Sequence, residues 1–543
     1  MSDRPWLKNY PVRWNLDYPE VSLYDYINEY CKEYPELIAL VFMGNEITYR
    51  EMQQNINRMA AALSDLGFKK GDRLALMLPN CPQYVYTYYA CMKLGVVVVQ
   101  MNPLYTPREV EFILIDSGAT AYVSADAIFN SFQQVREKVQ VNKVIVTRLL
   151  GKEVEGENYW FEDLLQQYPP ETPGADISPR EDVAVFQYTG GTTGMPKAAM
   201  LTHYNLISNV VQSKEWFKEK IEEFFQNGVE QRYGVAVLPL FHSYGMTSCM
   251  NTGLAIPSGQ VLIHQFDVEM VLDMINKYRP TLFPAVPTMY TAILSHPDAD
   301  KYGIDAVEVC NSGAAPMPVE AMKKFESKTG SKILEGYGLS EASPTTHCNP
   351  FSGIRKHGSV GVPFPDTDCK IVDTETGSSE MPVGEEGELI IKGPQVMKGY
   401  WNRPEETAKT LRDGWLYTGD IAKMDEDGYF YIVDRKKDMV LTGGYNVYPR
   451  EVDEVLFEHP KVLEAVTAGI HDDYYGEILK AYIVLNEGET ATEKEILNFM
   501  QDKLAKYKIP REMEFRQELP KSTVGKILRR ELVEEEKKKR GLK

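Results

Sequence analysis

The sequence predicts an α/β fold: a large N-terminal domain of layered, mostly parallel sheets that includes a β-rich subdomain, followed by a small α+β C-terminal domain. The chain has 543 residues, which is too many for one hydrophobic core. Short β-branched runs alternate with helical patterns over most of the sequence, and from about residue 369 the pattern changes to short strands with glycine-rich turns. A run of charges at 434–438 separates this region from a last α/β pattern.

Residues 51–66 are expected to form an amphipathic helix, because apolar side chains recur there at helical spacing. Residues 73–78 are typical of a short apolar strand, and Pro79-Asn80 is typical of a turn. A second helix is expected over 82–94, leading into the strand Val96–Val99. The apolar face of the first helix carries Met52, Ile56, Met59, Ala60, Leu63 and Leu66.

The same alternation continues along the chain. Compact β-branched runs at 144–146, 183–188, 235–239 and 261–263 predict further strands, and 204–217 has a helical pattern. Strands that are apolar throughout are typical of parallel sheets that are covered on both faces. This part of the chain therefore favours layered parallel sheets.

The β-rich subdomain is expected over 369–434, where the runs CKIVD, GELIIKG and GYFYIVDR alternate with glycine-rich turns. The charges at 434–438 mark a boundary, so we expect a large domain over 1–434 and a small one over 438–543. The charged tail from residue 534 is typical of a solvated, fraying helix end. Elements of the small domain are expected at 451–457, 462–470 and 478–485.

Composition limits the classes of function. The formal net charge of −19 argues against a protein that grips nucleic acid, because such binding draws on clustered Lys and Arg. The seven cysteines are scattered singly without the spacing of a zinc site, which predicts reduced thiols. The first ten residues are polar and no apolar run is long enough for a membrane span. A cytoplasmic enzyme is expected.

The segment 188–197, with the sequence YTGGTTGMPK, is the strongest sign of chemistry. It follows an expected strand, and its glycines allow close approach of backbone N–H groups to phosphate, while its hydroxyls and lysine supply further donors. It does not match the Walker A pattern, because Lys197 is followed by alanine. We expect phosphate binding by Thr189, Gly190, Gly191, Thr192, Thr193, Gly194 and Lys197.

This loop resembles the phosphate loop of the adenylate-forming superfamily, which includes acyl-CoA synthetases, luciferases and the adenylation domains of peptide synthetases. The resemblance continues in order through the chain and is closest to bacterial long-chain fatty acid–CoA ligases. It is carried by PLFHSYGM (239–246), SGAAPMP (312–318), EGYGLSEASP (335–344), DGWLYTGD (413–420), DRKKDMVLTGGYNVYP (434–449) and PKSTVGKILRR (520–530).

The resemblance implies an ATP site with Mg²⁺. Glu341 is a hard oxygen ligand of the kind that Mg²⁺ prefers, and Thr189 is expected to share the metal. Asp420 is suited to accept hydrogen bonds from the ribose, with Arg435 donating to the ribose or phosphates. Ser340 stands where the family usually has threonine and is expected to contact the α-phosphate. Adenine is expected against the backbone of Gly313, Ala314 and Ala315, with Tyr337 stacked on it, and Glu335 and Gly336 are expected in the same ATP site.

The resemblance also implies a catalytic lysine, Lys526, which reaches from the small domain to the carboxylate and the α-phosphate. An ammonium there would offset the repulsion between two anions. His242 is expected beside the acyl group or the phosphates, with an ordinary buried histidine as the alternative. Gly443 and Gly444 would line the path of coenzyme A. Lys526 and the Gly443-Gly444 loop belong to the same small domain and must face one site in different half-reactions. The resemblance implies that the small domain rotates about a hinge at 435–437 centred on Lys437, so this domain is expected to be mobile.

The function that follows is a fatty acid–CoA ligase, which joins fatty acid and CoA through an acyl-adenylate and releases AMP and pyrophosphate. ATP, Mg²⁺ and coenzyme A are the expected cofactor and co-substrates. Four alternatives stay open: an acyl-AMP ligase that loads a carrier protein, an aryl-CoA ligase, a silent nucleotide or acyl sensor, and a phosphotransferase that forms ADP. The sequence also leaves open a transient peripheral membrane contact, a homodimer and the preferred chain length.

Overall fold

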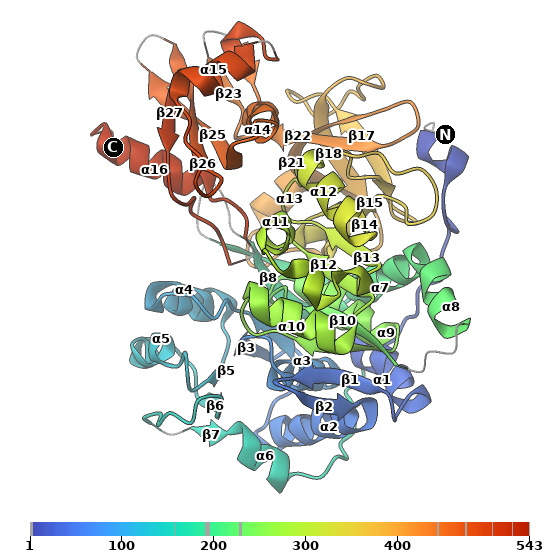
Figure 1. Cartoon of the computed structure of the whole chain (residues 1–543). Coiled ribbons are helices and arrows are strands. Elements are labelled where there is room, and N and C mark those ends of the chain that lie inside the picture. Colours follow the sequence, from blue (N-terminus) through green and yellow to red (C-terminus); the bar gives the residue numbers. More distant parts are fainter. Residues whose placement is uncertain are drawn as a thin grey trace.

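The structure is a computed structural model, and it describes residues 4–156, 158–189, 196–226, 231–442, 445–472, 475–501, 503–523 and 525–541. Two large sheets and their helices fill the lower and middle part of Figure 1. The β-rich elements lie at the upper right, and the C-terminal elements form a lobe at the upper left. The predicted α/β class, with a large N-terminal and a small C-terminal domain, is confirmed.

The first large sheet has eight described strands and is mainly parallel. Six neighbouring strands, β8, β4, β3, β5, β6 and β7, pair in parallel. At the other edge, β9 is antiparallel to both β8 and β19. The order is β19 (Gly399–Tyr400), β9 (Lys197–Thr202), β8 (Val183–Thr189), β4 (Val97–Gln100), β3 (Arg73–Met77), β5 (Ala121–Ala125), β6 (Lys143–Thr147) and β7 (Tyr159–Trp160).

The second large sheet has nine described strands. Its centre, from β14 to β1, is parallel, and its two edges are antiparallel. The order is β16 (Val362–Pro363), β15 (Thr345–Cys348), β14 (Lys332–Gly338), β13 (Val309–Ser312), β12 (Leu282–Ala285), β10 (Arg232–Ala236), β11 (Ser258–Leu262), β1 (Ile38–Phe42) and β2 (Asn45–Thr48).

Helices cover these sheets and share one large core. The predicted helix at 51–66 begins earlier, because Thr48 and Glu51 form a capping box, and Gly67 follows its end with φ +86°. The helices of this part are α1 (Leu23–Glu33), α2 (Tyr49–Asp65), α3 (Pro82–Leu94), α4 (Pro107–Ser117), α5 (Asn130–Gln133), α6 (Phe161–Gln167), α7 (His203–Trp216), α8 (Lys218–Gln226), α9 (Thr252–Ala255), α10 (Val268–Tyr278), α11 (Pro287–Ser295), α12 (Val319–Thr329) and α13 (Pro404–Thr410).

The strand predicted at 235–239 ends sooner, at Ala236, and Asn80 explains why. The Asn80 amide donates to the carbonyls of Ala236 (3.0 Å) and Leu238 (2.9 Å) and accepts from the Leu240 N–H (2.8 Å). These side-chain hydrogen bonds replace the sheet ladder after Ala236. The turn predicted at Pro79-Asn80 therefore holds the segment that leads into the 239–246 motif.

The β-rich region is an antiparallel sheet. The N-terminal segment runs across it: Tyr10 donates to the Pro363 carbonyl (2.6 Å), and Arg4 pairs with Asp368 (2.7 Å). A Cβ at Gly428 would lie 2.3 Å from the Trp6 nitrogen, so the two backbones touch there. The strands are β17 (Asp368–Val372), β18 (Gly387–Lys392), β21 (Trp415–Met424), β20 (Leu411–Arg412) and β22 (Phe430–Arg435), the last pairing with β21.

The C-terminal lobe has its own sheet and core. The prediction that the tail from 534 is solvated is wrong in part, because Glu536 is buried and pairs with Lys480 at 2.8 Å. Leu532 is also fully buried, which fixes this helix to the lobe. The elements are β23 (Val440–Thr442), β24 (Tyr445–Val447), α14 (Pro449–Phe457), β25 (Val462–Asp472), β26 (Gly476–Leu485), α15 (Glu493–Gln501), β27 (Glu512–Phe515) and α16 (Arg529–Lys539).

Two further sequence observations can be checked against the described residues. All seven cysteines lie within them, and all are buried and unpaired with one another, as predicted. Among the helices of the described segments, none combines the length and apolar character needed to cross a bilayer.

Candidate active site

The predicted phosphate loop begins at the end of β8 and returns along β9. Gly190, Gly191, Thr192, Thr193 and Gly194 lie outside the described residues. The two ends are described: the Thr189 hydroxyl donates to the Lys197 carbonyl at 3.4 Å. The Lys197 ammonium forms a close ion pair with Glu406 of α13 and lies 5.5 Å from the centre of the Tyr400 ring. These contacts place Lys197 beside α13 and β19.

Glu341 lies next to this group. The Tyr400 hydroxyl donates to Glu341 Oε1 at 2.8 Å, and the Glu341 carbonyl accepts from the Met397 N–H at 2.8 Å. In the described segments no group of three or more His, Cys, Asp or Glu side chains could form a metal cage. One carboxylate near the phosphate loop still fits Mg²⁺, because this ion commonly binds through one or two carboxylates together with phosphate oxygens and waters. Thr189 and Glu341 thus remain suitable metal neighbours.

The 239–246 and 335–344 motifs come together. Ser243 Oγ lies 3.3 Å from Ser340 Oγ, within hydrogen-bonding distance. His242 Nδ1 accepts from the Tyr244 N–H at 3.2 Å, so the neutral ring carries its proton on Nε2. Burial, reinforced by the positive charge of Lys526, lowers the pKa of His242 to about 4. His242 is therefore a neutral hydrogen-bond donor near pH 7, close enough to Lys526 for the lysine charge to affect its pKa.

Gly313 and Ala314 of the predicted nucleotide site directly follow β13, whereas Glu335, Gly336 and Tyr337 lie in the second half of β14. A Cβ at Gly313 would lie 3.2 Å from the Tyr244 ring, so glycine allows a close contact there. Ala314 has φ +66°, a conformation that non-glycine residues rarely adopt. The Tyr244 hydroxyl donates to the Asn311 carbonyl at 2.8 Å, which holds this ring against the 313–314 backbone.

Glu335 differs from its neighbours in burial. Its side chain is 3% exposed, and Oε1 accepts from the Met317 N–H at 3.3 Å. Burial raises the pKa of this carboxyl to about 7, despite the nearby Arg450. A nucleotide contact from this position would come from the backbone of Glu335 and Gly336 rather than from the buried carboxyl.

The predicted ribose residues form a connected group with Tyr337. The Tyr337 hydroxyl donates to Asp420 Oδ2 at 2.5 Å, and Arg435 Nε pairs with Asp420 Oδ1 at 2.7 Å. Asp420 and Arg435 face each other across β21 and β22, so the sheet register creates the pair. Because each carboxylate oxygen has two acceptor positions, Asp420 can still accept from hydroxyl groups.

Lys526 lies in the loop before α16, which descends from the C-terminal lobe to the large domain (Figure 1), and its charge interacts with those of Arg435 and Asp420. Asn102 donates to the Thr523 hydroxyl at 3.3 Å, and a Cβ at Gly525 would lie 2.5 Å from Thr288 Oγ1. The loop is therefore packed tightly against the large domain. The Lys526 side chain is exposed to solvent, but partial desolvation, aided by the Arg435 guanidinium, lowers its pKa to about 8.

The segment predicted as a hinge is a turn. The Asp438 N–H donates to the Arg435 carbonyl at 3.0 Å, and Lys437 is the third residue of that turn. The Lys436 N–H donates to the Gly419 carbonyl at 3.0 Å. The predicted coenzyme A glycines, Gly443 and Gly444, lie outside the described residues.

Comparison with known proteins decides the family. The family model for AMP-binding enzymes matches residues 27–401, and the model for the AMP-binding enzyme C-terminal domain matches 451–526. The chain belongs to the AMP-binding enzyme family. This membership confirms the resemblance to adenylate-forming enzymes.

Relatives of this AMP-binding enzyme span its length. A long-chain-fatty-acid–CoA ligase of Bacillus subtilis is 43% identical over 98% of both chains, and one of Escherichia coli is 37% identical over 98% of both. A feruloyl-CoA synthase of Amycolatopsis is 36% identical over 92% of this chain and 96% of its own. The anthranilate CoA ligase AuaEII in complex with anthranoyl-AMP has a TM-score of 0.88 and 27% identity, covering 96% of this chain and 98% of its own.

Several supporting residues of the AMP-binding enzyme could not be identified from the sequence. Asp116 accepts from the Tyr188 hydroxyl (2.8 Å) and from Arg403 (2.6 Å), which ties the start of the phosphate loop to the turn before α13. Glu406 and Tyr400 belong to the same region. Their partners lie far away in sequence, and no motif that we recognised covered 399–407.

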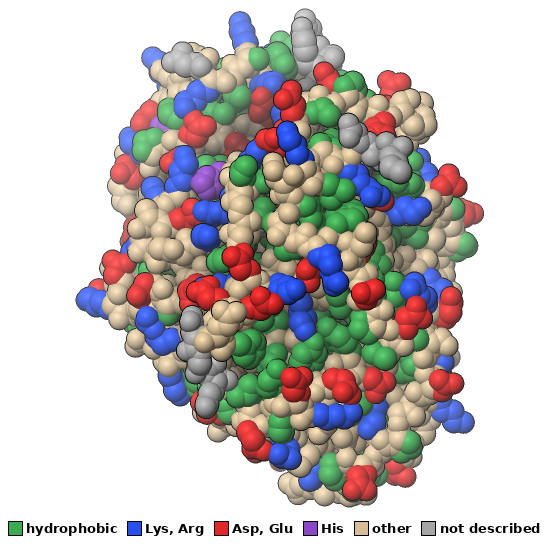
Figure 2. All heavy atoms as spheres, turned by 90° about the vertical axis from the view of Figure 1, so that its right-hand side faces the viewer, with side chains coloured by type: hydrophobic (Ala, Val, Ile, Leu, Met, Phe, Trp, Pro, Cys, Tyr) green, Lys and Arg blue, Asp and Glu red, His purple; other side chains and the backbone are tan. Residues whose placement is uncertain are grey.

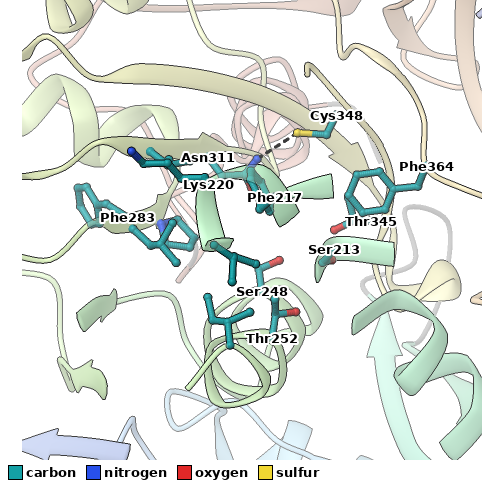
Figure 3. A pocket seen from close by; sticks show the side chains of 15 residues that line it. Ser213, Phe217, Lys220, Ser248, Thr252, Phe283, Asn311, Thr345, Cys348 and Phe364 are labelled. Carbon is teal, nitrogen blue, oxygen red and sulfur yellow. Dashed lines mark hydrogen bonds between the residues drawn. The ribbon is translucent and has the colours of Figure 1, made fainter. Parts of the chain in front are cut away.

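The AMP-binding enzyme also contains an apolar cavity, shown in Figure 3. Its volume of about 680 Å³ includes the opening to solvent. The cavity lies between the helices that follow β9 and the strands β12, β13 and β15. Its lining includes Ser213, Phe217, Lys220, Ser248, Thr252, Phe283, Asn311, Thr345, Cys348 and Phe364.

Proposed function

We propose that this protein is a fatty acid–CoA ligase that converts ATP, a fatty acid and coenzyme A to acyl-CoA, AMP and pyrophosphate. The observation that carries the proposal is that Lys526 of the C-terminal domain lies close enough to the Asp420–Arg435 ion pair and to His242 to interact with them electrostatically. The full-length relatives named long-chain-fatty-acid–CoA ligases support the fatty acid as substrate.

The nucleotide roles are proposed residue by residue. The phosphates would lie along 189–194 and Lys197, with Ser340 at the α-phosphate. Adenine would lie between Gly313-Ala314 and Tyr337, and Asp420 with Arg435 would hold the ribose. Mg²⁺ would bind Glu341 and Thr189 with the phosphates, where it would supply charge neutralisation of the triphosphate.

In the first half-reaction, a carboxylate oxygen attacks the α-phosphorus and the bond to pyrophosphate breaks. The Lys526 ammonium offsets the repulsion between the carboxylate and phosphate and stabilises charge on the equatorial oxygens. The His242 Nε2–H donates to an oxygen at the same centre. In the second half-reaction, the thiol of coenzyme A releases its proton to solvent and the sulfur attacks the acyl carbon, while the carboxylate oxygen leaves with AMP.

The apolar cavity is the proposed acyl site. It adjoins Asn311, whose carbonyl anchors Tyr244 beside Gly313, so one end lies near the nucleotide residues. An aryl acid is the second candidate, because a feruloyl-CoA synthase is also a full-length relative. Comparing kcat/KM for palmitate and ferulate separates the two, and a clear preference for ferulate would refute the fatty acid assignment.

Product identity tests the proposed function itself. With palmitate, coenzyme A and Mg²⁺-ATP, we expect AMP, pyrophosphate and palmitoyl-CoA in equal amounts. ADP as the product would indicate a phosphotransferase. Thioester formed on a carrier protein but not on coenzyme A would indicate an acyl-AMP ligase. The cytoplasmic location, peripheral membrane contact and homodimer remain part of the proposal, and vesicle sedimentation and light scattering test the last two.

We also propose that the domains divide at 434 and 438, with 435–437 as the hinge and Lys437 at its centre. Rotation there would exchange Lys526 for the Gly443-Gly444 loop between the half-reactions. An arrangement with Lys526 beside the Asp420–Arg435 pair would be the one suited to adenylation.

A disulfide that prevents this rotation is expected to separate the half-reactions. A Cβ at Gly525 would lie 3.7 Å from the Thr288 Cβ, within the roughly 3.5–4.5 Å that disulfides span. The oxidised Gly525→Cys, Thr288→Cys variant should keep acid-dependent ATP–pyrophosphate exchange and lose most thioester formation from supplied acyl-AMP. Reduction should restore the loss, and the single-cysteine variants serve as controls. Equal thioester rates in the oxidised and reduced forms would exclude the rotation.

The lowered pKa of Lys526 predicts a pH dependence. The ammonium is required, so activity is present below the pKa of about 8 and is lost as the pH rises through it. We expect kcat/KM for ATP in the pyrophosphate exchange assay, which contains no coenzyme A thiol, to fall about tenfold per pH unit above pH 8. The Lys526→Arg variant, whose side chain cannot lose its charge in this pH range, should be slower but should not show the decline. A decline that persists in this variant would mean that a group other than Lys526 titrates.

A further inference from the structure

Lys220 is one of the residues that line the cavity in Figure 3. Its side chain is 7% exposed and belongs to the lining. Ser213, Phe217 and Lys220 recur at helical spacing across the end of α7 and the start of α8, so they face the cavity together. The Lys220 ammonium forms a close ion pair with Glu308 and a second one with Glu223 at 2.9 Å.

The lysine lies at the end that is remote from the nucleotide residues. Glu308 immediately precedes β13, whereas Gly313 immediately follows it. At about 3.3 Å per residue, a strand from 308 to 313 spans roughly 16 Å. Because each C–C bond of about 1.5 Å advances an extended zigzag chain by only about 1.25 Å, an acyl group needs about thirteen bonds to cover this distance.

The charged ends of Glu308 and Glu223 lie at the surface, whereas the methylene stem of Lys220 lies inside. The side chains of Glu308 and Glu223 are 41% and 52% exposed. The ring of Phe351 lies 5.9 Å from the Lys220 ammonium. A lysine commonly buries its methylene groups and keeps its ammonium near solvent. Helix α8 lies on the side of the molecule that Figure 2 faces, where charged and hydrophobic side chains are interspersed.

We propose that the Lys220 stem is the end wall of the acyl pocket and that its ion pairs with Glu308 and Glu223 hold this wall closed, which limits the acyl chain length. The inference rests on the proposed function. Each methylene buried before the wall should raise kcat/KM about fourfold, the equivalent of about 0.8 kcal/mol. A longer chain must displace the lysine and break its ion pairs, so the gain should stop there.

A receptor for a second carboxylate at the far end of the substrate is the competing role. The observed charges disfavour it, because two carboxylates already surround one ammonium. A third carboxylate would add uncompensated negative charge. The structure therefore favours a closing contact over a binding site for dicarboxylic acids.

The test is the chain-length profile of kcat/KM from octanoate to eicosanoate. In Lys220→Ala, the ratio of eicosanoate to palmitate should rise about tenfold, because the removed stem leaves room for additional methylenes. Lys220→Met, which keeps a flexible stem without the charge, and Glu308→Gln should each raise the ratio less. Lys332→Ala is the matched control: its ammonium lies 4.5 Å from the same Phe351 ring, but Lys332 is absent from the cavity lining of the described residues, so the parental profile is expected.

Two results would overturn the inference. One is a parental profile in folded Lys220→Ala and Lys220→Met. The other is a parental preference for hexadecanedioate over palmitate that Lys220→Ala abolishes, which would make Lys220 a carboxylate receptor. If the parent enzyme activates no acid of any length, the proposed function fails, and this outcome is distinct from an unchanged profile.

Discussion

Alanine in place of Lys526 is expected to slow acyl-adenylate formation by about a thousandfold, the upper range for loss of one stabilising donor. Thioester formation from supplied acyl-AMP should continue at close to the parental rate. The reason is that Lys526 acts where the carboxylate meets the α-phosphate, and this encounter is complete once the adenylate exists. ATP–pyrophosphate exchange measures the first step, and single-turnover thioester formation measures the second.

Lys521 provides the matched control for this experiment. It precedes the same loop, but its ammonium pairs with Glu464 in the C-terminal sheet at 2.5 Å, away from the cleft. Lys521→Ala should therefore leave both half-reactions intact. Equal losses of both half-reactions in Lys526→Ala would mean that the lysine supports the structure rather than adenylation.

Removal of the Glu341 carboxylate is expected to have the next largest effect, lowering adenylate formation by about a hundredfold. Glu341→Ala removes one metal ligand and leaves the fold intact, because the backbone contact to Met397 does not depend on the side chain. Titration calorimetry should show weaker binding of Mg²⁺-ATP in this variant, with a smaller change for ATP in the presence of EDTA. This second measurement separates metal binding from a general loss of activity.

Two variants control for the Glu341 result. Glu405→Ala removes an exposed carboxylate from α13 and should behave as the parent. Tyr400→Phe removes the hydroxyl that donates to Glu341 and should weaken metal affinity by about tenfold, the lower range for loss of a supporting hydrogen bond. A Glu341→Ala enzyme with parental pyrophosphate exchange would refute the metal assignment.

The parts of the fold that depend on local pattern were predictable from the sequence. The helix at 82–94 coincides with α3, since its limits are set by Pro82 and by Gly95 in the left-handed conformation. The strands at 183–188 and 144–146 correspond to β8 and β6, because a run of apolar and β-branched residues is a local pattern. Parallel order could be inferred because continuous apolar strands need cover on both faces.

Other features depend on contacts between distant residues and could not be predicted. The early end of β10 follows from Asn80, which lies more than 150 positions before that strand. The position of Tyr400 over Lys197 and Glu341 follows from the pairing of β19 with β9. The burial of Glu536 follows from Lys480 on β26. In each case a partner that no local pattern indicates decides the result.

In the candidate site, too, local motifs indicate individual residues, whereas contacts between distant residues bring them together. The motifs indicated Asp420, Arg435 and Ser340 individually, but the register of β21 and β22 brings the first two together. The 3.3 Å contact between Ser243 and Ser340 joins two motifs that are almost a hundred residues apart. Lys220 carries no motif, and only the packing of α8 against β13 indicates a role for it.

Isotope transfer tests the central claim most directly, because it follows the oxygen that attacks the α-phosphorus. Palmitate with ¹⁸O in both carboxylate positions should react with ATP and coenzyme A to give AMP that carries one ¹⁸O in its phosphate, while palmitoyl-CoA keeps the other. Mass spectrometry of the two products measures both. Unlabelled AMP, or label found in inorganic phosphate beside ADP, would contradict an acyl-adenylate route.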